Sequence, residues 1–527
     1  MIRLRQIKVP IINDNKDVVI DKICNKLKIS KDDIFNFNII KKSIDARDKN
    51  NILYVYEVDI EIAREDIILK HNRDKDIIKS ESRNYEYSIS GNKKLNNRIV
   101  IVGSGPSGLF CAYMLAEAGF KPIVLERGEK MEDRVRTVCD FFENNNLNVN
   151  SNIQFGEGGA GTFSDGKLNT LVKDKLNRGK KVFEIFVENG APSEIMYLQK
   201  PHIGTDILRN VIVNMRNKII ALGGEFFYNS TVTDILVDDN KINGVIINNQ
   251  NKLFCDVLVL AIGHSARDTF LMLHKRNLAM KNKNFAVGVR IEHPQEMINR
   301  SQYGDYYKLL PPASYKLVYQ CKNGKSVYSF CMCPGGYVVN ASSELNRLAI
   351  NGMSNYNRDG NNANSAIVVN VGSEDYGDNL FDGLEFQRKL EEAAYKLGKG
   401  FIPIQLYKDF VNGVKTEKIY DVIPNTKGNY SFADLNLLFP KIITDSLKEA
   451  IPYFGTKIKG FDRDDAILLG VESRTSSPII IERDEDGVSS ISGIYPCGEG
   501  CGYAGGITTA AIDGIKVFEK IISMYKF

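Results

Sequence analysis

The stretch from Arg98 to Gly128 constrains this chain more than any other, because it has the pattern of a βαβ dinucleotide-binding unit. The apolar run Ile99 to Val102 predicts a buried parallel strand, and glycines at 103, 105 and 108 predict a tight turn into a helix. Apolar residues continue at helical spacing to Glu117, and residues 123–125 predict a second strand. A helix that begins at such a turn directs its N-terminal amides at a pyrophosphate. A bound nucleotide is therefore the first hypothesis.

The residues of this unit that we expect to contact the nucleotide lie at the turn and at the end of the second strand. Glu126 follows that strand, where a carboxylate accepts hydrogen bonds from a ribose hydroxyl and repels a 2′-phosphate. A glycine-rich turn alone is weak evidence, but strand, turn, helix, strand and acid in register argue against an α/β turn that binds nothing. The predicted contacts are Gly103, Gly105, Pro106, Ser107, Gly108, Glu126 and Arg127.

Two downstream segments predict that the nucleotide is FAD rather than NAD. Residues 256–265 (DVLVLAIGHS) form an apolar strand that ends in a small-residue turn, after a β-rich stretch around Val232. Residues 495–514 place Gly498 and Glu499 after a short strand and then begin an alanine-rich helix, which on its own could also be a buried structural helix. The carboxylate can bind ribitol hydroxyls, and the helix start favours an anionic reduced flavin. The predicted contacts are Val232, Gly263, Gly498, Glu499, Gly506 and Ile507.

A third candidate for flavin contact is the small-residue loop from Gly158 to Thr162 and the polar residues after it. Small residues permit a ligand to approach the backbone closely. We predict flavin contacts from Gly161, Thr162, Ser164, Asp165 and Lys167.

Long strings elsewhere resemble a family of uncharacterised bacterial FAD-dependent dehydrogenases, or NAD(P)/FAD-dependent oxidoreductases, within the glutathione-reductase-like flavoproteins. The resemblance covers most of the chain and implies FAD and redox chemistry, but no substrate. The strings are FGEGGAGTFSDGKL at 155–168, KPHIGTDIL at 200–208, VGVRIEHP at 287–294, FCMCPGG at 330–336, ESRTSSP at 472–478 and the segment at 498–499.

The fold class that we predict is α/β, with a discontinuous Rossmann-like FAD-binding domain over residues 93–284 and 491–527. An α+β substrate cap is inserted over residues 285–490, since ligands of nucleotide folds bind at the strand carboxyl ends between domains. Residues 1–92 contain a small α+β domain, ferredoxin-like in pattern, together with the first part of a linker. The linker is the polar segment over residues 79–97. We expect this domain to be structural, because it carries no metal-ligand or phosphate motif.

Composition narrows the class of partner. The 527 residues carry 69 basic and 65 acidic side chains, a net charge of +4, so no nucleic-acid partner is expected. The start lacks the apolar core of a signal peptide, and no window reaches the roughly 18 apolar residues of a membrane span. We therefore expect a cytoplasmic protein with no membrane partner. Nine cysteines are too few for a disulfide scaffold, and no metal site is predicted.

The catalytic candidates are polar residues in glycine- or proline-punctuated strings. His202 and His293 can transfer protons near neutral pH, and Arg290 and Arg474 can bind a carboxylate or stabilise reduced flavin. A thiol near the flavin can relay electrons, so the pairs Cys331/Cys333 and Cys497/Cys501 are candidates for a redox role. Free cysteines, however, are usually buried apolar residues. We predict His202, Arg474, Cys333 and Arg290 as the catalytic set.

The function we predict is that of an FAD-dependent oxidoreductase, in which a hydride passes between flavin N5 and a small-molecule substrate or electron donor under the cap. A second glycine-rich turn after a strand is absent from the sequence, so we expect the flavin to be reduced either by the substrate or by a transiently bound donor such as NAD(P)H. The alternatives are a flavin-dependent RNA-modifying enzyme and a non-catalytic FAD-binding redox sensor.

Overall fold

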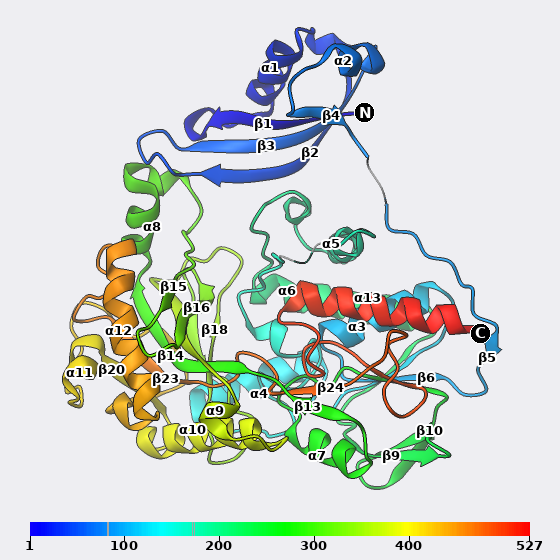
Figure 1. The fold of residues 1–527 in the computed structure, drawn as a ribbon, viewed down its shortest axis with the longest axis vertical. Helices are drawn as coiled ribbons and strands as arrows, with labels where there is room; N and C mark the ends of the chain where they lie inside the picture. The colour runs from blue at the N-terminus through cyan, green and yellow to red at the C-terminus, as the bar shows by residue number, and fades with distance from the viewer. Residues whose placement is uncertain (82–83, 171, 173, 527) are drawn as a thin grey trace.

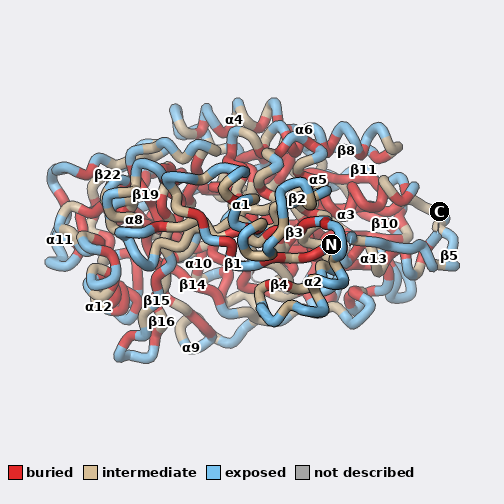
Figure 2. Tube along the Cα trace, turned by 90° about the horizontal axis from the view of Figure 1, so that it is seen from above, coloured by how far each residue is buried: buried red, intermediate tan, exposed pale blue. Residues whose placement is uncertain are grey.

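The computed structural model describes residues 1–81, 84–170, 172 and 174–526. Figure 1 shows a small N-terminal unit, a nucleotide domain around α3 and α13, and a cap that contains the largest sheet. Each body has its own buried apolar cluster. Peripheral helices such as α4 (Met131–Asn144) have one exposed side, whereas the strands of the central sheets are buried (Figure 2).

The N-terminal unit has the element order β-α-β-β-α-β, and all its strand pairs are antiparallel, as in ferredoxin-like folds. Its sheet has the order β2-β3-β1-β4, with α1 and α2 on one face (Figure 1). Alternating residues form β3, whose Val58 and Ile60 are buried against the helices. The elements are β1 (Ile2–Pro10), α1 (Lys16–Leu27), β2 (Ile34–Asp45), β3 (Leu53–Ile62), α2 (Glu65–His71) and β4 (Ile77–Lys79).

The nucleotide domain is built on a five-stranded parallel sheet with the order β25-β12-β6-β7-β8. The central strands β6 and β12 are buried on both faces, as continuous apolar runs in parallel sheets usually are. One face packs on α3 and α13, and the other on an antiparallel meander and α7. The strands are β6 (Ile99–Val102), β7 (Ile123–Leu125), β8 (Glu225–Phe227), β12 (Val257–Leu260) and β25 (Ile494–Pro496), and the meander is β9 (Val232–Asp238), β10 (Lys241–Ile247) and β11 (Asn251–Phe254).

The predicted βαβ unit forms where the sequence indicates it, with α3 spanning Pro106–Glu117. This helix is buried over most of its length, because it lies between the sheet and α13 (Ile507–Met524). Side chains at two positions would keep the layers apart. A Cβ at Gly108 would lie 2.0 Å from the Gly103 carbonyl oxygen, and one at Gly514 would lie 2.3 Å from the Ser107 carbonyl oxygen. The remaining helices of this domain are α5 (Arg178–Glu188), α6 (Thr205–Ala221) and α7 (Arg267–Lys275).

The cap contains a seven-stranded sheet with the order β15-β16-β19-β14-β23-β20-β22. The chain enters and leaves the cap beside a two-stranded link, β13 (Met280–Asn282) with β24 (Ile479–Ile481). The sheet strands are β14 (Phe285–Pro294), β15 (Val318–Gln320), β16 (Ser326–Cys333), β19 (Asn362–Val371), β20 (Ile402–Leu406), β22 (Tyr430–Phe432) and β23 (Ile467–Glu472). A smaller sheet holds β17 (Tyr337–Asn340), β18 (Ile350–Met353) and β21 (Thr426–Lys427), and the helices are α8 (Gln295–Tyr303), α9 (Ser373–Tyr376), α10 (Asp382–Gly398), α11 (Tyr407–Asn412) and α12 (Lys441–Lys457).

The N-terminal unit docks on the nucleotide domain through backbone hydrogen bonds of Lys42. The Lys42 amide donates to the Tyr197 carbonyl (2.8 Å), and the Gln199 amide donates to the Lys42 carbonyl (3.0 Å). Part of the segment predicted as a linker is also packed, since the Tyr87 ring contacts Phe518 edge-on and β5 (Lys93–Lys94) pairs with β26 (Tyr525–Lys526). Residues 82 and 83 of that segment lie outside the described residues. Within the described ranges, no helix combines the length and apolar character needed to cross a bilayer.

Candidate active site

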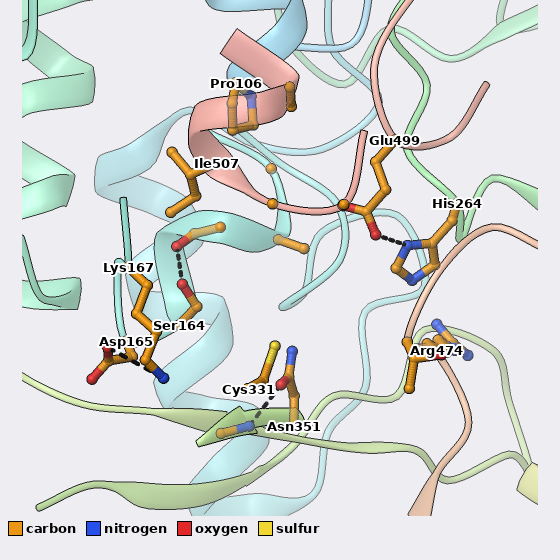
Figure 3. A pocket seen from close by; sticks show the side chains of 18 of the residues that line it. Pro106, Ser164, Asp165, Lys167, His264, Cys331, Asn351, Arg474, Glu499 and Ile507 are labelled. Atoms are coloured by element: carbon orange, nitrogen blue, oxygen red, sulfur yellow. Dashed lines mark hydrogen bonds and ion pairs between the residues drawn. The ribbon is translucent and has the colours of Figure 1, made fainter. Parts of the chain in front are cut away.

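A cavity of about 1120 Å³ runs from the β6–α3 turn of the nucleotide domain to the sheet of the cap. Its walls come from segments far apart in sequence, with Pro106 and Ile507 on one side and Cys331 and Asn351 of the cap opposite (Figure 3). Ser164, Asp165 and Lys167 form a third side. The βαβ motif and the cap therefore share one chamber.

The β6–α3 turn has the geometry of an anion site. Gly103 has a φ of +100°, and a Cβ there would lie 2.3 Å from the Ala261 carbonyl oxygen, so only glycine fits. Pro106 occupies the first helical turn, where its missing N–H costs nothing. The start of α3 lines the cavity, and a helix N-terminus carries the partial positive charge that binds phosphate.

Glu126 lies buried at the carboxyl end of β7 and lines the cavity. Its Oε2 accepts from the Ser104 amide (2.9 Å) and hydroxyl (2.6 Å). Its Oε1 accepts from the amides of Gly128 (2.9 Å) and Gly156 (3.0 Å). The carboxylate already accepts four hydrogen bonds from the protein. A ribose hydroxyl would have to replace one of these donors, most simply the rotatable Ser104 hydroxyl.

The loop over residues 152–163 is held from behind by Arg134, a residue of α4 that is fully buried. Its guanidinium donates to the carbonyl oxygens of five residues and lies over the Phe163 ring at 4.8 Å. Burial lowers the pKa of Arg134 to about 10, which still leaves it charged at neutral pH. The carbonyl acceptors are Asn152 (3.0 Å), Ile153 (2.9 Å), Gly156 (3.2 Å), Glu157 (2.6 Å) and Gly159 (3.0 Å).

A His–Glu pair lines the cavity between the nucleotide sheet and the start of α13. The Nδ1 atom of His264 lies 2.8 Å from the Glu499 Oε1 atom, as Figure 3 shows. The Nε2 atom of His264 is buried, and the described residues offer it no partner. A buried unpaired ring nitrogen in a cavity wall is a natural contact for a polar ligand group. The sequence interpretation missed His264, although it lies in the turn after a predicted strand.

Comparison with known proteins identifies the parts of the chain. Residues 101–138 match a family described as NAD(P)-binding Rossmann-like domain, and residues 284–475 match FAD-dependent protein, C-terminal domain-like. Residues 1–61 match a domain of unknown function. An uncharacterised protein of Clostridium beijerinckii is 48% identical over 521 residues, covering 98% of this chain and 97% of its own length. The chain belongs to the family of this protein.

Two other similarities are more limited. A stretch of 54 residues, 10% of this chain and 11% of the other, is 54% identical to an L-amino-acid oxidase of Daboia russelii. The structure of glycine oxidase from Bacillus cereus superimposes with a TM-score of 0.35 at 12% identity, over 80% of this chain and 94% of that one. A TM-score this low carries no argument about function. Together the matched domains identify the family member as an FAD-dependent oxidoreductase, whereas membership of the glutathione-reductase-like group stays a prediction.

The cavity residues fit FAD. The backbone is open at Gly263, Gly505 and Gly506, where a Cβ would meet nothing within 4 Å. An anion site at α3, two carboxylates and the unpaired His264 nitrogen complement a pyrophosphate flanked by two polyol groups. Most predicted cofactor residues line this cavity, and their contact with FAD remains a prediction. They are Gly103, Gly105, Pro106, Ser107, Glu126, Arg127, Gly161, Ser164, Asp165, Lys167, Val232, Gly263, Glu499, Gly506 and Ile507.

Three predicted cofactor residues lie behind the wall, and their direct contact is corrected. Gly108 is a packing glycine between α3 and the β6 turn. A Cβ at Gly498 would lie 2.3 Å from the Ser107 hydroxyl oxygen, so this glycine also permits close packing. Thr162 is fully buried, and its carbonyl oxygen accepts from the Thr205 hydroxyl (2.6 Å).

Two predicted catalytic residues do not line the cavity, and these predictions are also corrected. The Arg290 guanidinium is fully buried and donates to Glu472, Asn351, Asn364 and the Cys331 carbonyl. It therefore supports the cap floor from beneath. The His202 ring stacks on Tyr356, and its Nε2 donates to the Tyr356 carbonyl (2.8 Å). Burial lowers the pKa of His202, so the ring is neutral and serves as a structural hydrogen-bond donor.

Arg474 does reach the cavity, but its guanidinium is already engaged. It forms a two-point ion pair with Glu391 (both 2.8 Å) and donates to the hydroxyls of Ser343 (2.6 Å) and Ser265 (3.1 Å). Arg267 of α7 also binds Glu391 at 2.8 Å. Arg474 thus belongs to a buried Arg–Glu–Arg cluster that joins the nucleotide domain to the cap.

Cys331 and Cys333 both line the cavity, and of the two only Cys331 is exposed. Cys331 lies at an irregularity of β16 with a φ of +42°, and its thiol points into the chamber (Figure 3). Cys333 is 1% exposed and donates to the Cys331 carbonyl (3.3 Å). Burial raises the pKa of Cys331 to about 12, and that of Cys333 also rises, so both thiols are protonated. Cys497 and Cys501 are fully buried packing residues away from the cavity wall.

Proposed function

We propose that this FAD-dependent oxidoreductase transfers a hydride between flavin N5 and a small molecule held against the cap sheet. The observation that carries the proposal is the continuity of one cavity from the α3 phosphate turn to Cys331, Asn351 and Glu472 of the cap. FAD, when bound, supplies the hydride chemistry, and the protein supplies position and electrostatics.

The chain's own residues have three roles in this proposal. The start of α13, from Gly506 to Thr509, directs a partial positive charge into the cavity and would stabilise negative charge on a reduced flavin. Apolar residues of the cap wall, such as Leu317 and Ile350, limit the access of water. The Cys331 thiol and the Lys200 ammonium line the chamber as proton-carrying groups.

Anaerobic reduction of the FAD-loaded protein tests the proposal. NADH, NADPH and a panel of small organic substrates are mixed with it in turn while the absorbance of oxidised flavin is followed. We expect at least one to bleach the flavin, and Ser314→Phe, which adds bulk on the cap side of the cavity, to slow that step while FAD stays bound. If dithionite alone reduces the flavin, and no tested compound then reoxidises it, the proposal is contradicted. Fast bleaching by NADH or NADPH would assign the transient reductant.

The two alternatives receive no support from the described residues. An RNA-modifying enzyme would need a basic face, but on β1 of the N-terminal unit Arg3 is ion-paired with Asp59 (2.7 Å) and Arg5 with Glu57 (3.4 Å). A non-catalytic FAD-binding redox sensor would bind flavin without turnover, and the anaerobic reduction experiment distinguishes it from the enzyme.

A further inference from the structure

We infer that the cap side of the cavity recognises an organic anion, whose charge is held by Lys200 and Lys167. This inference rests on the proposed function, because it names the class of the substrate. Its basis is a set of cations in the chamber that the protein's own carboxylates do not balance.

Lys200 is the central residue of this set. It lies directly after the segment that pairs with Lys42 of the N-terminal unit, so its backbone is fixed from outside the chamber. Its Nζ donates to the Ser314 hydroxyl (3.1 Å) across the cavity. Within the described residues no carboxylate oxygen lies within 4 Å of this ammonium. Burial and the neighbouring cations Arg358 and Lys167 lower the pKa of Lys200, as expected of an ammonium without a counter-charge.

The nearest carboxylate in this region is already committed. Asp165 is buried and accepts from both Nε (3.0 Å) and Nη2 of Arg358, and from the Ser354 hydroxyl. Lys167 reaches the same carboxylate only at 3.7 Å. One negative charge is therefore shared by two cations, which leaves part of the Lys167 charge for a ligand.

The net charge of all the residues that line the cap side is also positive. The cations that line it are Lys167, Lys200, Lys316, Arg358 and Lys457, and the carboxylates are Asp165 and Glu472. Glu472 is neutralised by Arg290 beneath the floor (2.9 Å). Lys200, Lys316 and Lys457 are exposed, so their charge attracts ligands from solvent, and an excess of positive charge along a concave wall favours an anion over a cationic ligand. Lysines bind carboxylates and phosphates as point charges, so both are members of the expected class.

The test is a binding titration with the full-length, FAD-loaded protein, read from the perturbation of the flavin spectrum. The probes are benzoate, phenyl phosphate and the uncharged benzamide. We expect at least one anion to bind about tenfold or more tightly than benzamide, which corresponds to one charge-assisted hydrogen bond. Tighter binding of benzoate would indicate a carboxylate site, and tighter binding of phenyl phosphate would indicate a phosphate site.

Variants of Lys200 assign the effect. Lys200→Gln should raise the Kd of the anion about tenfold and leave that of benzamide unchanged, and Lys200→Arg should keep most of the affinity. Lys389→Gln, on the exposed side of α10, is the matched control and should change neither value.

Three results would overturn the inference. The first is that benzamide binds as well as the anions, and the second is that none of the probes perturbs the flavin. The third is an unchanged anion Kd in Lys200→Gln. Each of these results would leave the proposed hydride transfer standing, because reduction of the flavin is measured separately. Conversely, selective anion binding without reduction by any compound would count against hydride transfer alone.

Discussion

Single residues behind the cavity wall support the backbone that lines it. Gly108, predicted as a contact, acts through packing, and Arg290 and His202, predicted as catalytic, hold the backbone of the chamber. The sequence shows that such residues are special, but it does not show whether a side chain points into a cavity or away from it. The pair formed by His264 and Glu499 joins residues 235 positions apart, and no local pattern could predict it.

Gly108→Ala tests the packing role. The new Cβ would lie 2.0 Å from the Gly103 carbonyl oxygen, so α3 must shift away from the turn. Overpacking of this kind costs about 1–3 kcal/mol, and we expect the Kd of FAD to rise about tenfold or more. Equilibrium titration with FAD measures it. Gly179→Ala is the control, since its Cβ would have no neighbour closer than 3.7 Å. Equal FAD affinity in the two variants would refute the packing role.

Because His293 is buried, we expect the stability of the folded protein to depend on pH. The ring is buried in the cap, its Nε2 donates to the Phe461 carbonyl (2.7 Å), and burial lowers its pKa to about 4. Between pH 4 and the ordinary value near 6.5 the unfolded chain binds the extra proton, so stability falls as the pH falls. The loss is about 3 kcal/mol over this window.

Denaturant unfolding at pH 5 and pH 7 measures this effect by comparison with His293→Gln, which keeps a donor for Phe461. The comparison is needed because burial raises the pKa of the neighbouring Glu292 to about 7, which makes stability fall as the pH rises. We expect the variant to lose less stability than the wild type on going from pH 7 to pH 5. Identical losses would show that His293 does not carry the effect.

At the scale of elements, local patterns predicted the strands and helices better than their ends. The predicted β6, α3 and β7 formed, because apolar runs and glycines act over a few residues. Helices usually end before a proline, but α12 continues through Pro452 to Lys457. The apolar residues after the proline, including Phe454, are buried in the cap core, and this tertiary packing stabilises the last turns.

The loop over residues 152–163 depends on one helix residue. Arg134→Lys should loosen it, because a lysine cannot donate to five carbonyls spread around a planar guanidinium. We expect a loss of about 3 kcal/mol or more in the free energy of unfolding and a weaker hold on FAD. Denaturant unfolding and FAD titration measure these effects. The exposed neighbour Arg136→Lys serves as the control, and wild-type behaviour of both variants would argue against this support.

For the whole molecule, the sequence predicted the succession of domains but not how they meet. The nucleotide domain and the cap are joined by a cluster in which Glu391 lies between Arg267 and Arg474, and all three are almost fully buried. Charged residues usually lie at the surface, so a sequence pattern does not predict that these three side chains are buried together. The docking of Lys42 on the segment before Lys200 also links the N-terminal unit to the chamber, although neither sequence contains a recognisable motif.

Glu391→Gln should weaken this junction strongly. Removing the carboxylate leaves the buried Arg474 guanidinium without a counter-charge and leaves Arg267 with Glu344 alone, which costs about 3–5 kcal/mol. Glu392→Gln, the adjacent residue in a partly exposed pair with Arg347, should cost about 1 kcal/mol or less. Thermal and denaturant unfolding compare the two. Similar small losses for both would mean that the cluster does not hold the two bodies together.

The most direct test of the account is a crystal structure of the FAD-loaded protein. We expect the pyrophosphate at the start of α3 and the isoalloxazine between the start of α13 and the cap residues Cys331 and Asn351. FAD bound elsewhere, or an isoalloxazine turned away from the cap into solvent, would contradict a shared chamber for cofactor and substrate.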